Sequence, residues 1–213
     1  MFCFVHVFLV DMQGKDLPVK IQENSRKLTI LSRVSTLLSM KNLGKNYAYI
    51  DGANLHKGVE QFGWNFDYGR FRVWLREKYR VEQAYLFLGL IPKYKNLYTR
   101  LQEQGFTLIF KEVTYDGNGR VKGNCDADIV VRVMQDAYEN NFDMAILVSS
   151  DGDYASLVSF LLEKRKLNAV LSPAIAKKCS ILLKRTGAKI SYLDDQKSIL
   201  EAKEKAPDTD GTV

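Results

Sequence analysis

Oxygen-bearing side chains that can bind a divalent cation occur at three separate places in the chain, each beside an apolar run. They are Asp51 and Asn54, Asp126 and Asp128, and Asp151 and Asp153. Carboxylates held close together repel one another, so a converging cluster of them usually needs a metal ion. If the three places meet in the fold, the sequence predicts a metal site for phosphate chemistry.

The segments that must position these side chains alternate between strand and helix from residue 46 onward. Apolar runs of strand length cover residues 46–51, 81–91, 106–112, 143–149, 167–172 and 189–193. Helical spacing of apolar residues predicts helices over 67–79, 93–104, 125–140, 153–165 and 175–186. This alternation predicts an α/β domain with a mainly parallel sheet. Ligands of such sheets bind beyond the carboxyl ends of strands, where Asp51 and Asp151 stand.

Three parts of the chain differ in pattern. Residues 46–195 carry the alternation and are long enough to form one domain with a sizeable core. Residues 1–45 form an N-terminal arm without clear periodicity. The arm is either disordered or partly helical, or it is a mis-assigned leader before a true start at Met40. Residues 196–213 are expected to form a polar tail, and residues 194–202 could form a short closing helix.

The composition excludes several classes of protein. No apolar run approaches the roughly 20 residues that a membrane-spanning helix needs. The three cysteines show no paired spacing, which argues against a zinc site and a disulfide framework. A cytoplasmic protein with reduced thiols fits this pattern.

The charges are segregated along the chain, which has a net charge of +6. Residues 112–162 hold nine acidic and three basic residues, whereas residues 163–195 hold eight basic and three acidic ones. A metal-binding acidic pocket with a basic rim suits a nuclease, because the rim attracts the phosphate backbone. The alternative is that most of these lysines and arginines simply lie on solvent-exposed helix faces.

Three motifs resemble those of a known family. They are Tyr49-Ile50-Asp51-Gly52-Ala53-Asn54, Lys122-Gly123-Asn124-Cys125-Asp126-Ala127-Asp128 and Ser149-Ser150-Asp151-Gly152-Asp153-Tyr154. Their order, spacing and context resemble the NYN-domain (LabA-like) branch of the PIN-like nucleases over about residues 46–193. The resemblance implies a three-layer α/β/α sandwich with a Rossmann-like sheet. It also implies hydrolysis of RNA with Mg²⁺ or Mn²⁺ as cofactor.

The resemblance also implies roles for individual residues. By position, the catalytic acids are Asp51, Asp126, Asp151 and Asp153, and the first three of these are the expected metal ligands. Supporting roles fall to Asn54, Asp128, Ser149 and Ser150. The chain departs from the family pattern at Ser150, where many relatives have glycine, and at Cys125, where valine is more usual.

A metal held by these acids would lower the pKa of a bound water that attacks phosphorus, so no side-chain nucleophile is needed. Each residue also has a structural alternative. Asp51 and Asn54 could form a turn beside a glycine, and Asp126 could be an acid favoured by a helix dipole. Ser149 and Ser150 could serve as caps or turn donors.

The expected substrate contacts come from two segments. Arg120 belongs to a Gly-rich turn over residues 115–120 that could close over a nucleic-acid strand, and Lys122 could hold a phosphate or an acidic neighbour. Tyr94 and Tyr98 lie four residues apart among basic residues, which suits single-stranded RNA unless the two tyrosines belong to the core.

Three functions compete at this point. A metal-dependent ribonuclease acting on RNA, with no membrane partner, explains most of the pattern. A catalytically weak RNA-binding or regulatory module of the same fold is the alternative. A different phosphotransfer enzyme is disfavoured, because Asp51-Gly52-Ala53 lacks the Asp-x-Asp of one phosphatase class and the glutamate of a Toprim domain. Homo-oligomerisation stays open.

Overall fold

The computed structural model describes residues 5–10, 16–21, 44–112, 114–115, 121–122 and 124–203. The chain divides into two units, residues 1–43 and residues 44–213. In the first unit, β1 (Val5–Val10) and β2 (Asp16–Ile21) pair antiparallel as a hairpin. The sequence pattern predicted no strand in this arm.

The second unit is built on a six-stranded sheet in which every pair of strands is parallel. Its order is β10-β9-β8-β3-β4-β5. The strands are β3 (Asn46–Asp51), β4 (Val81–Gly89), β5 (Thr107–Lys111), β8 (Ala145–Val148), β9 (Leu167–Ser172) and β10 (Ile190–Tyr192). The chain builds outward from β3 in both directions, so strand order reverses between β3 and β8. A parallel sheet binds ligands at the carboxyl end of this point.

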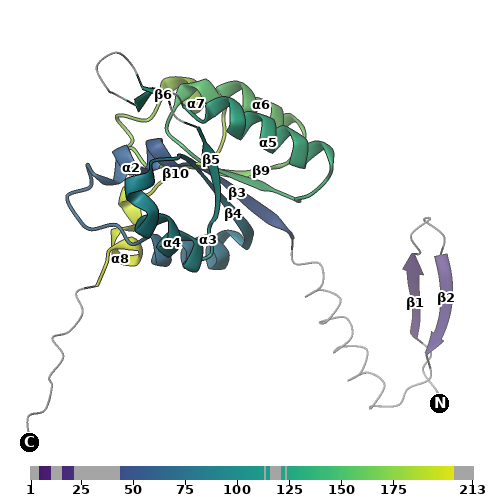
Figure 1. Cartoon of the computed structure of the whole chain (residues 1–213). Coiled ribbons are helices and arrows are strands. Elements are labelled where there is room, and N and C mark those ends of the chain that lie inside the picture. Colours follow the sequence, from purple (N-terminus) through teal and green to yellow (C-terminus); the bar gives the residue numbers. More distant parts are fainter. Residues whose placement is uncertain are drawn as a thin grey trace, which may run out of the picture. The chain divides into compact units, whose positions relative to one another are not determined.

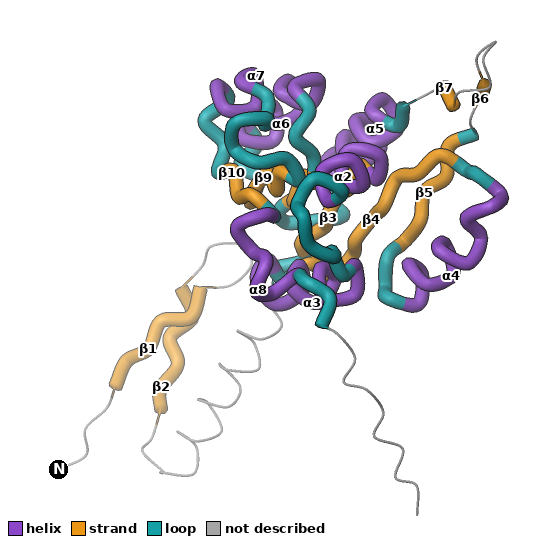
Figure 2. Tube along the Cα trace, turned by 90° about the vertical axis from the view of Figure 1, so that its left-hand side faces the viewer, coloured by secondary structure: helices purple, strands orange, loops and turns teal. Residues whose placement is uncertain are grey.

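Helices cover both faces of the sheet, which gives three layers (Figures 1 and 2). One face carries α5 (Asp126–Tyr138), α6 (Ala155–Glu163) and α7 (Ile181–Arg185). The other carries α3 (Tyr68–Tyr79), α4 (Lys95–Glu103) and α8 (Lys197–Leu200). Side chains alternate across β3 as a strand requires: Tyr47 and Tyr49 pack under the first helices, and Ala48 and Ile50 under the second. The predicted α/β/α sandwich is confirmed.

Helix α2 (Gly52–Val59) was not predicted, because its sequence contains two glycines and reads as a turn. It begins directly after β3 and lies at the carboxyl ends of the strands (Figure 1). Gly52 packs against β4 so closely that a Cβ would lie 2.5 Å from the carbonyl oxygen of Phe87. A glycine is therefore needed at the entry to this helix.

The helix predicted over residues 175–186 is shorter than expected, since α7 starts only at Ile181. The backbone N–H of Ser180 donates to the carbonyl oxygen of Ser150, 3.1 Å away, which places Ser180 against the turn after β8. The Ser180 hydroxyl then caps α7 by accepting from the N–H of Leu182.

Short elements complete the unit. They are the hairpin of β6 (Thr114–Tyr115) and β7 (Val121–Lys122) and the 3₁₀ turns η1 (Pro92–Tyr94), η2 (Gly152–Tyr154) and η3 (Asp194–Gln196). The segment from residue 196, expected as a polar tail, contributes α8 to the core through the fully buried Leu200. No helix in the described ranges is both long and apolar enough to cross a bilayer.

Candidate metal centre

Asp51 ends β3 and caps the helix that follows. Its Oδ1 accepts a hydrogen bond of 3.0 Å from the backbone N–H of Asn54, which satisfies one of the free donors at the start of α2. The side chain is buried at 6% exposure. Burial raises the pKa of this carboxyl above its usual range, and the charge of Asp126 raises it further.

Asp151 follows β8 and begins η2. Its Oδ1 accepts a 3.1 Å hydrogen bond from the N–H of Asp153, and its own N–H donates to Ser149 Oγ at 3.1 Å. Ser149 is completely buried, so its hydroxyl shapes the turn from inside. This local network directs Asp151 and Asp153 to the same side of the turn.

Asn54 joins the two strand ends. Its Oδ1 accepts hydrogen bonds of 2.9 Å from both the N–H and the hydroxyl of Ser150. The amide oxygen is therefore used to hold α2 against the turn after β8. Asn54 and Ser150, both predicted in supporting roles, are therefore in direct contact.

Acids from two distant segments of the chain, the start of α5 and the turn after β8, meet at this point. One carboxylate oxygen from each of Asp126, Asp151 and Asp153 lies within 4.8 Å of the others. Tyr154 connects the group to Asp51, because its hydroxyl lies 2.7 Å from Asp126 Oδ1 and 3.3 Å from Asp51 Oδ2. The structure thus brings all four predicted catalytic acids to the carboxyl ends of β3 and β8.

None of the ion pairs in the described part of the chain includes Asp51, Asp126, Asp151 or Asp153. Asp128, the remaining predicted acid, is paired with Lys111 Nζ at 2.7 Å and stands apart from the close-set trio. That hydrogen bond raises the pKa of Lys111. Lys111 thus forms its ion pair with Asp128, and the four clustered acids have no ion-pair partner among the described residues.

The family comparison agrees with this geometry, since the model of the NYN domain family matches residues 47–187. The chain belongs to the NYN domain family. NYN domains are PIN-like nucleases, so the family resemblance of the three motifs is confirmed. The matched range contains every acid of the cluster.

A solved structure has the same fold as this NYN domain. It is a protein of unknown function from Vibrio parahaemolyticus, 24% identical, with a TM-score of 0.59. The match covers 71% of this chain and 94% of that one. No curated protein matches the chain.

Cys125 lies beside the acids of the NYN domain but is a poor nucleophile. Burial raises the pKa of its thiol to about 11, and the charges of Asp128 and Asp51 add to this effect. The thiol is therefore protonated at neutral pH, whereas nucleophilic attack requires the thiolate. Tyr154 likewise keeps its proton, because burial and the charge of Asp51 raise its pKa.

The predicted substrate contacts have mixed outcomes. Arg120 lies outside the described residues, and Lys122 is described only as part of β7. Tyr98 belongs to the core: it is 9% exposed and its hydroxyl donates to the carbonyl oxygen of Gly89. The alternative that the tyrosines belong to the core therefore holds for Tyr98, whereas Tyr94 is exposed.

Two residues of the centre were not assigned roles from the sequence. Tyr154 ends the third motif, and its position directly after Asp153 is the feature of the sequence that could have indicated a role in the site. Lys111 ends β5, far from the motifs in sequence, and no pattern linked it to Asp128. Its role depends on tertiary structure alone.

Proposed function

We propose that this NYN domain is a metal-dependent ribonuclease that hydrolyses RNA phosphodiester bonds. The observation that supports it most directly is the convergence of four carboxylates that no cation of the described chain compensates. An RNA-binding module without catalysis has no need for such mutually repelling charges. The cluster therefore favours the catalytic function over the binding-only alternative.

The donor set fits Mg²⁺ or Mn²⁺, because hard cations of this kind prefer carboxylate oxygens. Mg²⁺–oxygen bonds of about 2.0–2.1 Å place ligand oxygens no more than about 4.2 Å apart around one ion. One oxygen from each of Asp126, Asp151 and Asp153 lies within 4.8 Å of the others, so small side-chain shifts would close the three acids around an ion. We propose Asp126 and Asp151 as metal ligands together with Asp51, which the Tyr154 hydroxyl links to Asp126, and Asp153 as a further acid within reach of the ion. When bound, the ion would supply a more acidic water and charge neutralisation at phosphorus.

The chain's own residues hold this arrangement in place. Asn54 and Ser150 clamp the ends of β3 and β8 together, and the Tyr154 hydroxyl fixes the spacing of Asp51 and Asp126. Pre-positioned groups of this kind avoid reorganisation during the reaction. Cys125 is protonated, and the nucleophile in this proposal is water.

The substrate is RNA, guided to the acidic cluster by the basic segment of residues 163–195. We place the activity in the cytoplasm, because Cys125 and Cys179 are both free thiols.

The test is incubation of the full chain with labelled single-stranded RNA, double-stranded RNA and DNA, each with Mg²⁺, Mn²⁺ or EDTA. We expect cleavage of single-stranded RNA with either metal and none with EDTA. Binding of RNA without metal-dependent cleavage would favour the binding-module function instead. Cleavage that persists in EDTA would remove the metal from the mechanism.

A further inference from the structure

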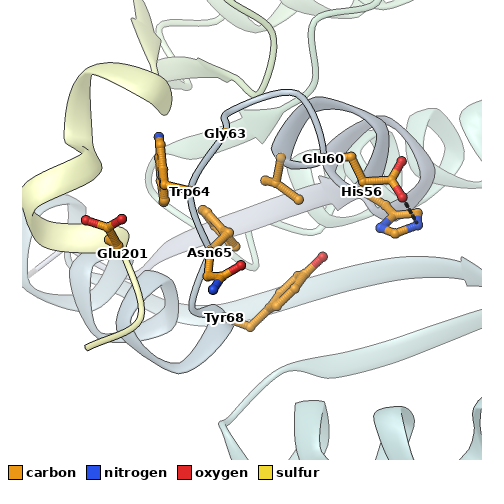
Figure 3. Close-up of a pocket in the computed structure, with 9 residues that line it drawn as sticks. His56, Glu60, Gly63, Trp64, Asn65, Tyr68 and Glu201 are labelled. Atoms are coloured by element: carbon orange, nitrogen blue, oxygen red, sulfur yellow. Dashed lines mark ion pairs between the residues drawn. The ribbon is translucent and has the colours of Figure 1, made fainter. Parts of the chain in front are cut away.

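A pocket of about 580 Å³ lies beside the last turn of α2 (Figure 3). Its lining comes from that turn, from the loop before α3 and from the residue after α8. The residues that matter here are His56, Glu60, Trp64, Asn65, Tyr68 and Glu201. His56 and Asn54 point to opposite sides of α2, since residues two apart are separated by about 200° around a helix. The pocket is therefore distinct from the acidic cluster.

Trp64 offers this pocket a rigid aromatic surface. Its ring stacks on Phe62 with centroids 4.9 Å apart, and its indole N–H donates to Asp194 Oδ1 at 3.2 Å. Phe62 covers one side of the indole without lining the pocket, whereas Trp64 borders the cavity. A ring held in this way loses little conformational entropy when a planar group stacks on it.

The opposite rim of the pocket is polar and acidic. Figure 3 shows the Tyr68 hydroxyl directed toward the space below Glu60, and His56 pairs with Glu60 at 3.4 Å. Burial raises the pKa of Tyr68 to about 12, and the charge of Glu60 contributes to the shift. Tyr68 therefore stays a hydrogen-bond donor and acceptor next to a carboxylate.

These groups exclude a phosphate and select a base. Glu60 and Glu201 stand at two ends of the cavity, and their carboxylates only accept hydrogen bonds and repel anions. Single-stranded RNA is read by stacking its bases on aromatic rings and by hydrogen bonds to their Watson–Crick edges. Guanine is the RNA base with two adjacent N–H donors, N1 and N2, on that edge. Adenine, cytosine and uracil each present an acceptor beside the donor, which a carboxylate disfavours.

We propose that the pocket binds a guanine base of single-stranded RNA, stacked on Trp64 with its donor edge toward Glu60. This inference rests on the proposed ribonuclease function and names a base preference for it. Helix α2 connects the two sites, with Asp51 at its start and Glu60 at its end. Its eight residues span about 12 Å, so one short stretch of RNA reaches both.

The first experiment measures binding in EDTA, where no cleavage occurs. The full chain is titrated calorimetrically with the 5′-monophosphates of guanosine, adenosine, cytidine and uridine. We expect guanosine monophosphate to bind at least tenfold more tightly than the other three. Equal binding of all four, or no binding of any, would overturn the proposal.

Two variants test the assigned contacts. Trp64→Leu should weaken binding of guanosine monophosphate about tenfold, the scale of losing one base stack. Glu60→Gln should remove the preference for guanine while some stacking remains, because the amide presents a donor where the carboxylate accepts. Tyr138→Leu is the matched control, because this aromatic side chain is 90% exposed at the end of α5, lies outside the pocket and should leave binding as in the wild type. Unchanged guanine binding in both pocket variants would contradict the assignment.

A third titration separates RNA from free nucleotides as the source of the base. A short RNA containing one guanosine should bind more tightly in EDTA than guanosine monophosphate does. The phosphates of its flanking nucleotides would add contacts with the basic segment of residues 163–195. Equal affinities would overturn the RNA assignment and leave a site for free guanine nucleotides.

Failure of the pocket and failure of the ribonuclease are distinguishable. If the full chain cleaves RNA with Mg²⁺ but guanosine monophosphate does not bind, the pocket proposal falls and the ribonuclease stands. If guanosine monophosphate binds but no RNA is cleaved, the guanine pocket stands and the ribonuclease falls.

Discussion

The two ends of helix α5 each hold an acid against a tyrosine of another element. Asp126, the first residue of the helix, accepts a 2.7 Å hydrogen bond from Tyr154. Asp136, near the end of the helix, accepts a 2.9 Å hydrogen bond from Tyr49 of β3. Both pairs attach the helix to the rest of the domain. They differ in the charges nearby, since Asp136 lies beside an arginine and Asp126 lies beside other acids.

Asp136 has its counter-charge within the same helix. It is 3% exposed and accepts hydrogen bonds from Arg132 Nε at 2.8 Å and from the Asn141 amide at 2.9 Å. Arg132 also donates to the hydroxyl of Tyr85, so the network is closed by the protein alone.

Asp126 has more acids as neighbours and no paired cation among the described residues. The difference separates a structural acid from one arranged for an external cation. Both ends use the same hydrogen-bond chemistry, so the missing positive charge is what distinguishes them.

The largest expected effect is on catalysis at the uncompensated end. Asp126→Asn should lower metal-dependent RNA cleavage by several orders of magnitude, because the amide keeps the shape but removes the charge that holds the ion. Initial rates on labelled RNA measure this effect. Asp128→Asn is the matched control in the same helical turn, and its cleavage rate should stay within about tenfold of wild type because Lys111 already compensates that acid. Equal losses in the two variants would break the proposed distinction.

At the compensated end, the effect should be on stability. Asp136→Leu leaves the Tyr49 hydroxyl and the Arg132 guanidinium without their shared acceptor, which should cost about 3 kcal/mol of unfolding free energy. Urea denaturation in EDTA measures the loss. A change below about 1 kcal/mol would show that the buried network contributes little to the fold.

Metal binding should stabilise the domain through the end of α5 that carries Asp126, and not through the end that carries Asp136. At a free Mg²⁺ or Mn²⁺ concentration of 100 times Kd, the expected gain is about 2.7 kcal/mol. Thermal unfolding with and without the metal should show a rise of several degrees in wild type and in Asp128→Asn. Asp126→Asn should show little or no rise; a full rise in that variant would place the ion elsewhere.

The sheet could be predicted from the sequence because its central strands are buried on both faces of the sheet and therefore appear as short, continuous apolar runs. The runs before Asp51 and Asp151 are examples, and their parallel pairing follows from the helices between them. The acids at those strand ends could then be placed at one edge. Helix α2 could not be predicted, because Gly52 and Gly58 serve close packing against β4 and Pro173 that only the tertiary fold reveals.

The connections between distant residues were also inaccessible to sequence reasoning. Tyr49 and Asp136 are 87 residues apart, and their contact depends on how α5 is rotated over the sheet. The same holds for Lys111 and Asp128, since the lysine reads as an ordinary strand end. Periodicity shows which face of an element is apolar but does not pair individual polar groups across elements.

The smallest expected effect is the pH dependence of stability at Asp51. Burial raises the pKa of this carboxyl above its ordinary value of 3.8, so folding favours its protonated form. That contribution to stability is fully present below the unfolded pKa and is lost as pH rises through the folded pKa.

Asn keeps the capping oxygen for α2 and does not ionise, which makes Asp51→Asn the informative variant. In EDTA, the stability of this variant relative to wild type should increase as pH is raised from below 3.8 toward neutral. Urea denaturation across that range measures the difference, and added Mg²⁺ should reverse it at neutral pH by stabilising only the wild-type carboxylate. A difference that does not vary with pH would mean that Asp51 carries no charge penalty, and the contrast between the two ends of α5 would then rest on Asp126, Asp151 and Asp153 alone.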